Sequence, residues 1–406
     1  MKRNCMIGQS GGPTAAINAS LAGVIGRAYE QGFEHVYGLQ NGIQGLLDET
    51  FFELSAFKDA SKLNALKHSP AMFLGSCRYK LPDTSQDLAP YEKIFEIFER
   101  LEITDFFYIG GNDSMDTVMK LSKYGKEHHH HIHFIGVPKT IDNDLMDTDH
   151  TPGFGSAAKY VAASMLEVIY DSMIYKVKSV TIVEIMGRNA GWLTAASALA
   201  RNENQVSPDL IYLPEVVFDR DEFIESIREL FKTRRNIIIA ISEGIRDKSG
   251  KFLDEDSSLA TTDVFGHVLH SGTGKILENL VRDTFGCKVR SIELNVLQRC
   301  AMHIASKTDL DESVMIGSAA VDEALKNETE KMMVFVRQPD NTMTVESRDV
   351  SKIANLEKRI PVEWIADNHH DIKQELYDYL YPLIQGEVNL EYKNGVPCYL
   401  DISHLK

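Results

Sequence analysis

Short apolar runs alternate with longer segments of helical spacing along most of the chain, and no other feature constrains the fold as strongly. A short apolar run bounded by turn residues predicts a buried strand, and the helical segment after it predicts a βα unit. The runs that we interpret as strands span 4–8, 106–109, 133–137, 179–185, 210–213, 236–241 and 288–294. The segments that we interpret as helices span 15–31, 91–101, 114–122, 156–170, 190–200, 221–232 and 265–285. The sequence therefore predicts an α/β fold with mostly parallel sheets and helices on both faces, in which ligands bind at the carboxyl edge of the strands.

The length and the charge balance narrow the class of protein. A chain of 406 residues accommodates two domains of the usual size, about 100–200 residues each. With 43 Lys and Arg against 59 Asp and Glu, the formal net charge of −16 disfavours a nucleic-acid binder, because phosphate backbones are held by clustered cations. Five scattered cysteines without a C-x-x-C pair argue against a disulfide framework or a structural zinc site. Since no apolar stretch reaches about 18 residues, we expect a cytoplasmic protein.

Two glycine-rich turns follow the first two predicted strands. Residues 8–18 (GQSGGPTAAIN) place two glycines where the strand ends and a proline where a helix is expected to begin, so that backbone N–H groups face an anion. Residues 108–114 (YIGGNDS) repeat this order, and Asn112 and Asp113 offer oxygen atoms to a metal ion. Each turn can also be a tight βα connection without a ligand. A structural turn, however, does not require Asn, Asp and Ser together.

The loop after the third predicted strand carries the densest set of reactive groups. Residues 136–145 read GVPKTIDNDL, so a buried strand delivers Lys139, Thr140, Asp142 and Asp144 onto one loop. Phosphoryl transfer needs an oriented acceptor hydroxyl, a base for its proton and positive charge near the moving phosphoryl group. A solvated acidic turn would explain neither the lysine nor the position after a strand. We interpret this loop as the centre of a phosphoryl-transfer enzyme.

Later strand ends add charged residues that suit phosphate recognition. Arg188 follows the fourth predicted strand in the sequence MGRN, where an arginine can bind phosphate through two parallel hydrogen bonds. Glu243, Arg290 and Arg299 are further candidates, although each of them alone is more often structural. Residues 153–158 (GFGSAA) are similar to a dinucleotide-binding fingerprint, but no strand directly precedes them. We therefore interpret them as a helix start that packs closely on a neighbour.

The series of motifs resembles that of the 6-phosphofructokinase family, in the same order and over about residues 5 to 320. The motifs are the Gly-Gly turn near the N-terminus, Gly-Ser-Cys-Arg at 75–78, Gly-Gly-Asn-Asp-Ser, Pro-Lys-Thr-Ile-Asp-Asn-Asp, Met-Gly-Arg, Ser-Glu-Gly and Leu-Gln-Arg. The resemblance is strongest to the pyrophosphate-dependent branch. It implies two Rossmann-like three-layer α/β/α lobes with a helical C-terminal extension. The lobes are a phosphoryl-donor lobe at 1–150 and about 300–350 and a sugar-phosphate lobe at 151–299, and the extension is 351–406.

The same resemblance implies roles for single residues. Asp142 resembles the base that takes the proton from the 1-hydroxyl of fructose 6-phosphate, with Lys139, Thr140, Asp144 and Asp113 as further catalytic residues. The positions that resemble the phosphoryl-donor site are Gly11, Gly12, Arg78, Gly111, Asn112 and Ser114, with Asn112 beside Mg²⁺. The positions that resemble sugar-phosphate contacts are Thr140, Ile141, Asp142, Met186, Gly187, Arg188, Glu243, Arg290 and Arg299.

Two positions bear on the phosphoryl donor. Family members that use ATP typically have glycine where this chain has Asp113 and Lys139. The Asp113 carboxylate would stand where the α-phosphate of ATP must pass, and like charges at close range repel by on the order of several kcal/mol at an effective dielectric of about 20. Lys139 would face the leaving phosphate and stabilise its charge. The resemblance thus implies a reversible glycolytic reaction in which pyrophosphate and fructose 6-phosphate, with Mg²⁺, give fructose 1,6-bisphosphate and phosphate.

Three departures from the family pattern leave alternatives open. Asn112 stands where the family usually has Asp, Val296 where it has His or Tyr near the sugar phosphate, and Ser179 where many tetrameric members place an Arg that reaches a neighbouring subunit. We expect a homo-oligomer, a dimer or tetramer, without nucleic-acid or membrane partners. The alternatives are an ATP-dependent phosphofructokinase, an enzyme for another acceptor such as sedoheptulose 7-phosphate, and a non-catalytic sugar-phosphate sensor on the same scaffold.

Overall fold

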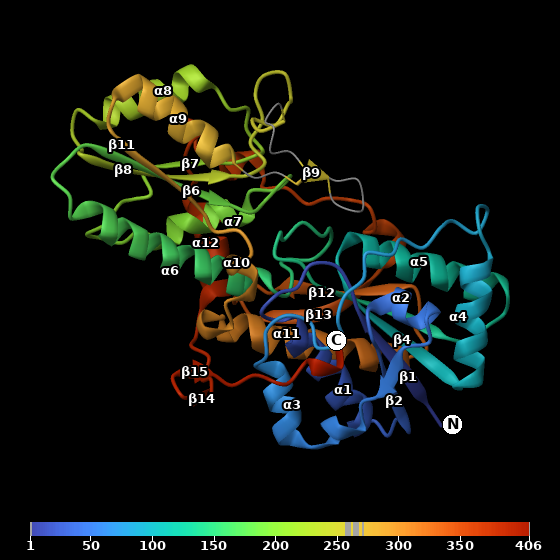
Figure 1. The fold of residues 1–406 in the computed structure, drawn as a ribbon. Coiled ribbons are helices and arrows are strands. Elements are labelled where there is room, and N and C mark those ends of the chain that lie inside the picture. The colour runs from blue at the N-terminus through green and yellow to red at the C-terminus, as the bar shows by residue number, and fades with distance from the viewer. Residues whose placement is uncertain (1, 256–260, 263–267, 270–271, 406) are drawn as a thin grey trace. The chain divides into compact units, whose positions relative to one another are not determined.

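The computed structural model describes residues 2–255, 261–262, 268–269 and 272–405 (Figure 1). The chain divides into two units, each assembled from segments that are distant in the sequence. Unit 1 contains Met1–Ser156, Arg299–Glu357 and Gly386–Lys406, and unit 2 contains Ala157–Gln298 and Lys358–Gln385. The stretch 351–406, which we expected to form one extension, is thus divided between the two units.

A seven-stranded sheet lies at the centre of unit 1, in the order β13-β12-β5-β4-β1-β2-β3. Its five inner strands run parallel, and each edge strand pairs antiparallel with its neighbour. The strands are β1 (Asn4–Gln9), β2 (His35–Leu39), β3 (Phe51–Glu53), β4 (Ile103–Gly110), β5 (His133–Pro138), β12 (Lys331–Arg337) and β13 (Met343–Asp349). Because β1, β4 and β5 are adjacent and parallel, the loops after them meet at one edge of the sheet.

Helices cover both faces of this sheet, as Figure 1 shows for α1 and α11 on one side and α4 and α5 on the other. Successive strand residues point to opposite faces, so Ile7 joins the apolar cluster beneath α1 and α11 while Met6 joins the cluster beneath α4 and α5. The helices are α1 (Ile17–Glu30), α2 (Gly42–Leu47), α3 (Ala60–Lys67), α4 (Ala89–Arg100), α5 (Asn112–Glu127) and α11 (Lys307–Leu325). Short elements are η1 (Ser55–Lys58), η3 (Met302–Ile304), η4 (Val350–Lys352), η7 (Ser403–Leu405), β14 (Tyr392–Lys393) and β15 (Val396–Pro397).

Helix α11 was not among the predicted helices, because buried polar residues such as Ser313 interrupt its apolar pattern. It packs against α1 through a glycine on each helix. A Cβ atom on Gly23 would lie 2.2 Å from the Val314 carbonyl oxygen, and one on Gly317 would lie 2.2 Å from the Ser20 carbonyl oxygen. Any larger side chain at either glycine would push the two helices apart.

Unit 2 contains a four-stranded parallel sheet in the order β11-β6-β8-β7. Figure 1 shows α8 and α9 on one side of it and α6 and α7 on the other. The strands are β6 (Ser179–Ile185), β7 (Leu210–Tyr212), β8 (Asn236–Ser242) and β11 (Lys288–Glu293). The helices are α6 (Phe154–Met173), α7 (Trp192–Ala195) with η2 (Ala196–Ala200), α8 (Arg220–Leu230), α9 (Thr273–Phe285), α10 (Leu297–Cys300), η5 (Val362–Trp364), α12 (Gln374–Leu380) and η6 (Tyr381–Ile384). The α/β prediction with mostly parallel sheets is confirmed.

One predicted helix is wrong in its first part. The predicted helix at 265–285 begins only at Thr273. Residues 268–269 form β10 (Val268–Leu269), which pairs with β9 (Thr261–Thr262), and 265–267 and 270–271 lie outside the described residues. Among the described residues, no helix combines the length and the apolar character needed to cross a bilayer.

Candidate functional site

Three loops of unit 1 meet at the carboxyl edge of its sheet. They are the N-terminal loop (residues 10–16) after β1, the Gly-Gly loop (residues 110–114) after β4 and the acidic loop (residues 139–145) after β5. The Lys139 backbone N–H donates to the Gly110 carbonyl oxygen at 2.9 Å, and the Lys139 Nζ donates to the Gly12 carbonyl oxygen at 2.7 Å. One lysine therefore contacts both glycine-rich loops.

Lys139 lies among charged groups although its side chain is buried. Its exposed fraction is 3%. Burial lowers the pKa of Lys139 to about 8, and the Arg299 guanidinium acts in the same direction, whereas Asp142 and Asp144 raise the pKa. Arg299 also adjoins the N-terminal loop, because a Cβ atom on Gly12 would lie 3.2 Å from its Nη1 atom. Two cations and two carboxylates thus gather where the three loops meet.

The acidic loop leaves its two carboxylates partly exposed. Ile141, Asn143 and Leu145 are buried, whereas Asp142 and Asp144, which alternate with them, are partly exposed. The Asp142 N–H donates to Thr140 Oγ1 at 3.1 Å, so the Thr140 hydroxyl holds the backbone of the residue that carries the carboxylate. This loop has the accessible carboxylates that proton transfer to or from a bound hydroxyl requires.

The Gly-Gly loop opens helix α5 directly. Gly111 is the residue before the helix, Asp113 is exposed in the first turn, and Ser114 is buried. The Asn112 Oδ1 atom is buried, and no hydrogen-bond partner reaches it among the described residues. An unsatisfied buried oxygen costs about 1–3 kcal/mol, so this atom is suited to a ligand. Within the part of the chain that the structure describes, no three His, Cys, Asp or Glu side chains form a metal cluster.

The N-terminal loop differs from the sequence prediction. Helix α1 begins at Ile17, so Pro13 lies in the loop and does not open the helix. The loop is held instead by tertiary contacts, since Ser76 Oγ donates to the Gly11 carbonyl oxygen at 2.7 Å and brings the 75–78 segment, with the exposed Arg78, beside it.

Thr14 in this loop was not singled out from the sequence. Its Oγ1 atom is buried and has no hydrogen-bond partner among the described residues. A Cβ atom on Gly153 would lie 2.7 Å from the Thr14 side chain, which confirms that 153–158 is a helix start packed closely on a neighbour. A hydroxyl shortly after two glycines was the only local signal for Thr14.

Unit 2 brings together the loops after β6 and β8. The Gly187 N–H donates to Glu243 Oε1 at 3.3 Å, and Ser242 Oγ donates to the Gly187 carbonyl oxygen. The Met186 N–H donates to Gln298 Oε1 at 3.4 Å. The Arg188 Nε atom is buried without a hydrogen-bond partner among the described residues. The Met-Gly-Arg and Ser-Glu-Gly motifs therefore form one cluster within this unit.

Two predicted sugar-phosphate residues are not part of this cluster within unit 2. Arg290 pairs in register with Thr181 in the middle of β6, so it sits three residues, about 10 Å, before the end of its own strand. Its side chain is 46% exposed on an edge strand and forms an ion pair with Asp171 at 3.1 Å. Arg299, expected in the sugar-phosphate lobe, begins the second segment of unit 1 and lies beside Gly12. From the sequence we expected Arg290 and Arg299 at the ends of strands. Their surroundings in space are decided only by the fold.

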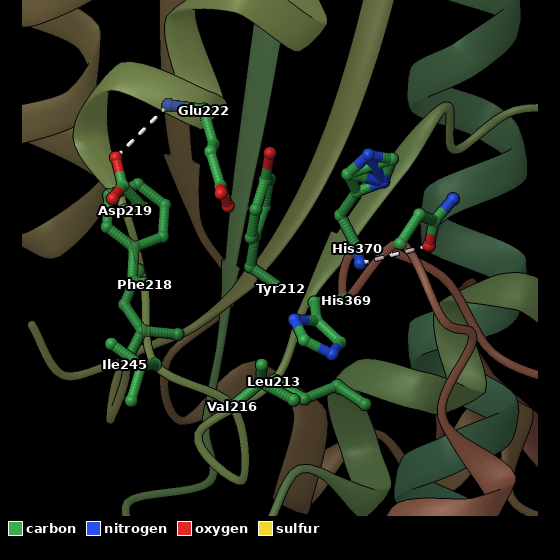
Figure 2. A pocket seen from close by; sticks show the side chains of 11 residues that line it. Tyr212, Leu213, Val216, Phe218, Asp219, Glu222, Ile245, His369 and His370 are labelled. Carbon is green, nitrogen blue, oxygen red and sulfur yellow. Dashed lines mark hydrogen bonds between the residues drawn. The ribbon is translucent and has the colours of Figure 1, made fainter. Parts of the chain in front are cut away.

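A separate cavity of unit 2 lies near the end of β7 (Figure 2). It is lined by Tyr212, Phe218, Glu222 and His370 among others, and by none of the predicted site residues. Its volume is about 20 Å³, close to the minimum of about 10–15 Å³ that one water molecule needs. The cavity is too small for a sugar phosphate.

Comparisons with known proteins identify the family of this chain. The phosphofructokinase family model matches residues 4–320. The pyrophosphate–fructose 6-phosphate 1-phosphotransferase of Halomonas elongata is 40% identical, covering 98% of this chain and 95% of that protein. The protein of the same name from Methylococcus capsulatus is 38% identical, covering 99% and 96%. The crystal structure of pyrophosphate-dependent phosphofructokinase from Nitrosospira multiformis matches with a TM-score of 0.89 and 36% identity, covering 98% of this chain and 96% of that chain. The resemblance seen in the motifs is confirmed, and this chain belongs to the phosphofructokinase family.

Proposed function

We propose that this chain transfers a phosphoryl group from pyrophosphate to the 1-hydroxyl of D-fructose 6-phosphate, which gives D-fructose 1,6-bisphosphate and phosphate. Relatives that match nearly the whole chain carry the names of pyrophosphate-dependent enzymes. Within this chain, the observation that carries the proposal is the buried Lys139 ammonium group, which contacts Gly12 and begins the acidic loop. Fixed positive charge at that place stabilises a departing phosphate.

Asp142 acts as the general base of the reaction. Its carboxylate accepts the proton of the 1-hydroxyl, whose oxygen forms a bond to one phosphorus atom of pyrophosphate while the bond from that atom to the bridging oxygen breaks. The departing phosphate keeps the bridging oxygen, and Lys139 stabilises its charge. Thr140 holds the backbone of Asp142 through the 3.1 Å hydrogen bond, and Asp144 stands beside it. Because both sides of the reaction have similar phosphoryl potential, the reaction is reversible and fits a glycolytic step.

The cluster of unit 2 supplies the sugar-phosphate contacts. The buried Arg188 Nε atom without a partner among the described residues suits a phosphate oxygen, since an arginine can bind phosphate through two parallel hydrogen bonds. Glu243 accepts from the Gly187 N–H, and its carboxylate group is of the kind that accepts a hydrogen bond from a sugar hydroxyl. Met186 and Gly187 shape the surface between these two groups.

Mg²⁺ fits the Gly-Gly loop. Asn112 has a buried oxygen without a partner among the described residues, and Asp113 has an exposed carboxylate. Proteins usually hold this ion through one or two such oxygens together with water and substrate phosphates, so Asn112 and Asp113 would hold it. When bound, the ion neutralises charge on the phosphoryl oxygens. The Asp113 carboxylate also disfavours the α-phosphate of ATP.

The chain functions as a homo-oligomer in the cytoplasm. Large apolar side chains are exposed at the end of α6 and just after it, among them Tyr170, Met173 and Ile174. Exposed apolar patches of this kind mark interaction surfaces, and Asp171, which forms an ion pair with Arg290 of β11, lies on the same helix. A second copy bound there would explain why Arg290 lies in register with Thr181 of β6 and not at the carboxyl end of its own strand. No disulfide joins the five cysteines, all of which lie among the described residues, and this suits a reducing compartment.

The test is a comparison of phosphoryl donors and acceptors with purified protein and Mg²⁺. We expect turnover of fructose 6-phosphate with pyrophosphate and little or none with ATP. Strong activity with ATP and none with pyrophosphate would favour the ATP-dependent alternative. Faster turnover of sedoheptulose 7-phosphate than of fructose 6-phosphate would show that the acceptor is sedoheptulose 7-phosphate. Binding of a sugar phosphate without turnover of any donor would favour the non-catalytic sugar-phosphate sensor.

A further inference from the structure

The first two turns of helix α11 hold the chain segment that follows the acidic loop. Asp309, 2% exposed, accepts hydrogen bonds from the Gly153 N–H at 2.8 Å and the Ser156 N–H at 2.9 Å, and from Ser156 Oγ at 2.5 Å. Ser306, which caps the same helix, adds one more bond to this cluster, because its N–H donates to Ser156 Oγ at 3.2 Å. A buried carboxylate of α11 thereby fixes the start of α6.

A second carboxylate of α11, that of Glu312, holds His150 in the same segment. His150 is 1% exposed and lies between Asp149 Oδ1 and Glu312 Oε2, each 2.9 Å from a ring nitrogen. Burial lowers the pKa of His150, but the hydrogen bonds to Asp149 and Glu312 outweigh it and raise the pKa to about 9. Its ring stacks on Phe335 of β12, and Arg337 of the same strand binds Asp149 through two hydrogen bonds. The charged groups around His150 are thus Asp149, Arg337, and Asp309 and Glu312 of α11.

This segment in turn holds the backbone of Thr140. The Thr140 N–H donates to the Pro152 carbonyl oxygen at 3.3 Å, and Thr151 Oγ1 donates to the Thr140 carbonyl oxygen at 2.8 Å. Thr140 and Gly153 form a parallel β-bridge. A continuous series of contacts therefore leads from Asp309 through residues 150–153 to Thr140, and from Thr140 to the Asp142 backbone.

We propose that Asp309 and His150 are positioning residues for the acidic loop: α11 fixes residues 150–156 through two carboxylates, and this segment fixes Thr140 and Asp142. This inference rests on the proposed function, because it expects the reaction rate to depend on the position of the Asp142 carboxylate. A misplacement of about 1 Å in a reacting group can reduce a rate by about 10²-fold, so a loop of this kind requires a rigid support. Helix α11 is such a support, because it packs against α1 at backbone distance.

The test compares Asp309→Asn with Glu323→Gln, a matched control. Glu323 is another buried carboxylate of α11, but it accepts from Ser347 Oγ at 2.5 Å and from Lys326 Nζ at 2.9 Å. In Asp309→Asn we expect kcat to fall about 10- to 100-fold, with KM for both substrates changing less than about threefold. In Glu323→Gln we expect kcat to be unchanged, although Tm falls. Equal kcat in the two variants at equal loss of Tm would overturn the proposal.

Hydrogen exchange of the peptide that covers 139–145 separates this proposal from the proposed function. We expect exchange at these amides to become about tenfold faster in Asp309→Asn than in the wild type and to stay unchanged in Glu323→Gln. This result would support positioning even if the wild type did not use pyrophosphate. If Asp309→Asn does not fold, Ser156→Ala removes one bond to Asp309, and faster exchange with a two- to fivefold lower kcat is expected. Unchanged exchange and kcat in Ser156→Ala would then refute the inference.

Discussion

Two buried cations of unit 1 have opposite surroundings. Lys139 donates to one carbonyl oxygen, and burial lowers its pKa to about 8, although two carboxylates are near. His150 lies in direct contact with two carboxylates, which raise its pKa to about 9. The folded protein thus favours the charged form of His150 and disfavours the charged form of Lys139. The charge of Lys139, which the fold does not neutralise, is available to an anionic ligand. The charge of His150, which two carboxylates neutralise, stabilises the fold.

The largest effect is expected for the carboxylate near Lys139. Asp142→Asn should lower kcat by about 10²–10⁴-fold, because the variant cannot accept the proton of the acceptor hydroxyl. The fold should be retained, because Asp142 is partly exposed. Steady-state kinetics with pyrophosphate and a thermal melt measure both effects. A rate close to that of the wild type would remove Asp142 from the mechanism.

Lys139→Met should lower kcat with pyrophosphate by about 10²–10³-fold, the range for removal of one group that stabilises developing charge. The same variant without ligand should have a higher Tm than the wild type at pH 7, because the folded wild type bears the cost of a buried charge at any pH below about 8. This difference should disappear as the pH rises from about 8 towards 10.5, where Lys139 is neutral in both states. Calorimetry over this pH range measures the difference in Tm between the variant and the wild type. A lower Tm for Lys139→Met than for the wild type at pH 7 would contradict the view that the buried charge of Lys139 is unfavourable for folding.

His150→Gln should have the opposite effect on stability. The folded pKa of about 9 exceeds the ordinary value of 6.5, so the stabilisation is complete below pH 6.5 and is lost as the pH rises through about 9. The wild type should therefore be more stable than His150→Gln by a few kcal/mol at pH 6, and the difference should shrink towards pH 10. Denaturant unfolding at several pH values measures this difference. A constant difference across that range would show that folding does not raise the pKa of His150.

The smallest effect is expected at Asp113. Asp113→Gly removes a charge but adds no contact, so we expect activity with ATP to rise about tenfold, equivalent to about 1.4 kcal/mol, while Mg²⁺ dependence weakens. Asp113→Asn is the matched control, because it removes the charge and keeps the size. If Gly raises ATP activity and Asn does not, the barrier to ATP is steric and not electrostatic.

The sequence determined the strands and the loops that follow them, because apolar runs, glycines and prolines act on their own neighbours in the chain. The positions of β1, β4, β5, β6 and β8, and with them all of the Gly-Gly and acidic loops, could be predicted in this way. Family resemblance added the donor preference through Asp113 and Lys139. None of these inferences required knowledge of how distant segments pack.

Only the tertiary structure decided which charged groups meet. Asp309 contacts Gly153 and Glu312 contacts His150 across a long stretch of chain, and no local pattern distinguishes these carboxylates from those on the surface of the same helix. The place of Arg299 beside Gly12 and the outward position of Arg290 likewise depend on the packing of whole elements. The physical reason is that burial and Coulomb interactions depend on distance in space, whereas the sequence records distance only along the chain.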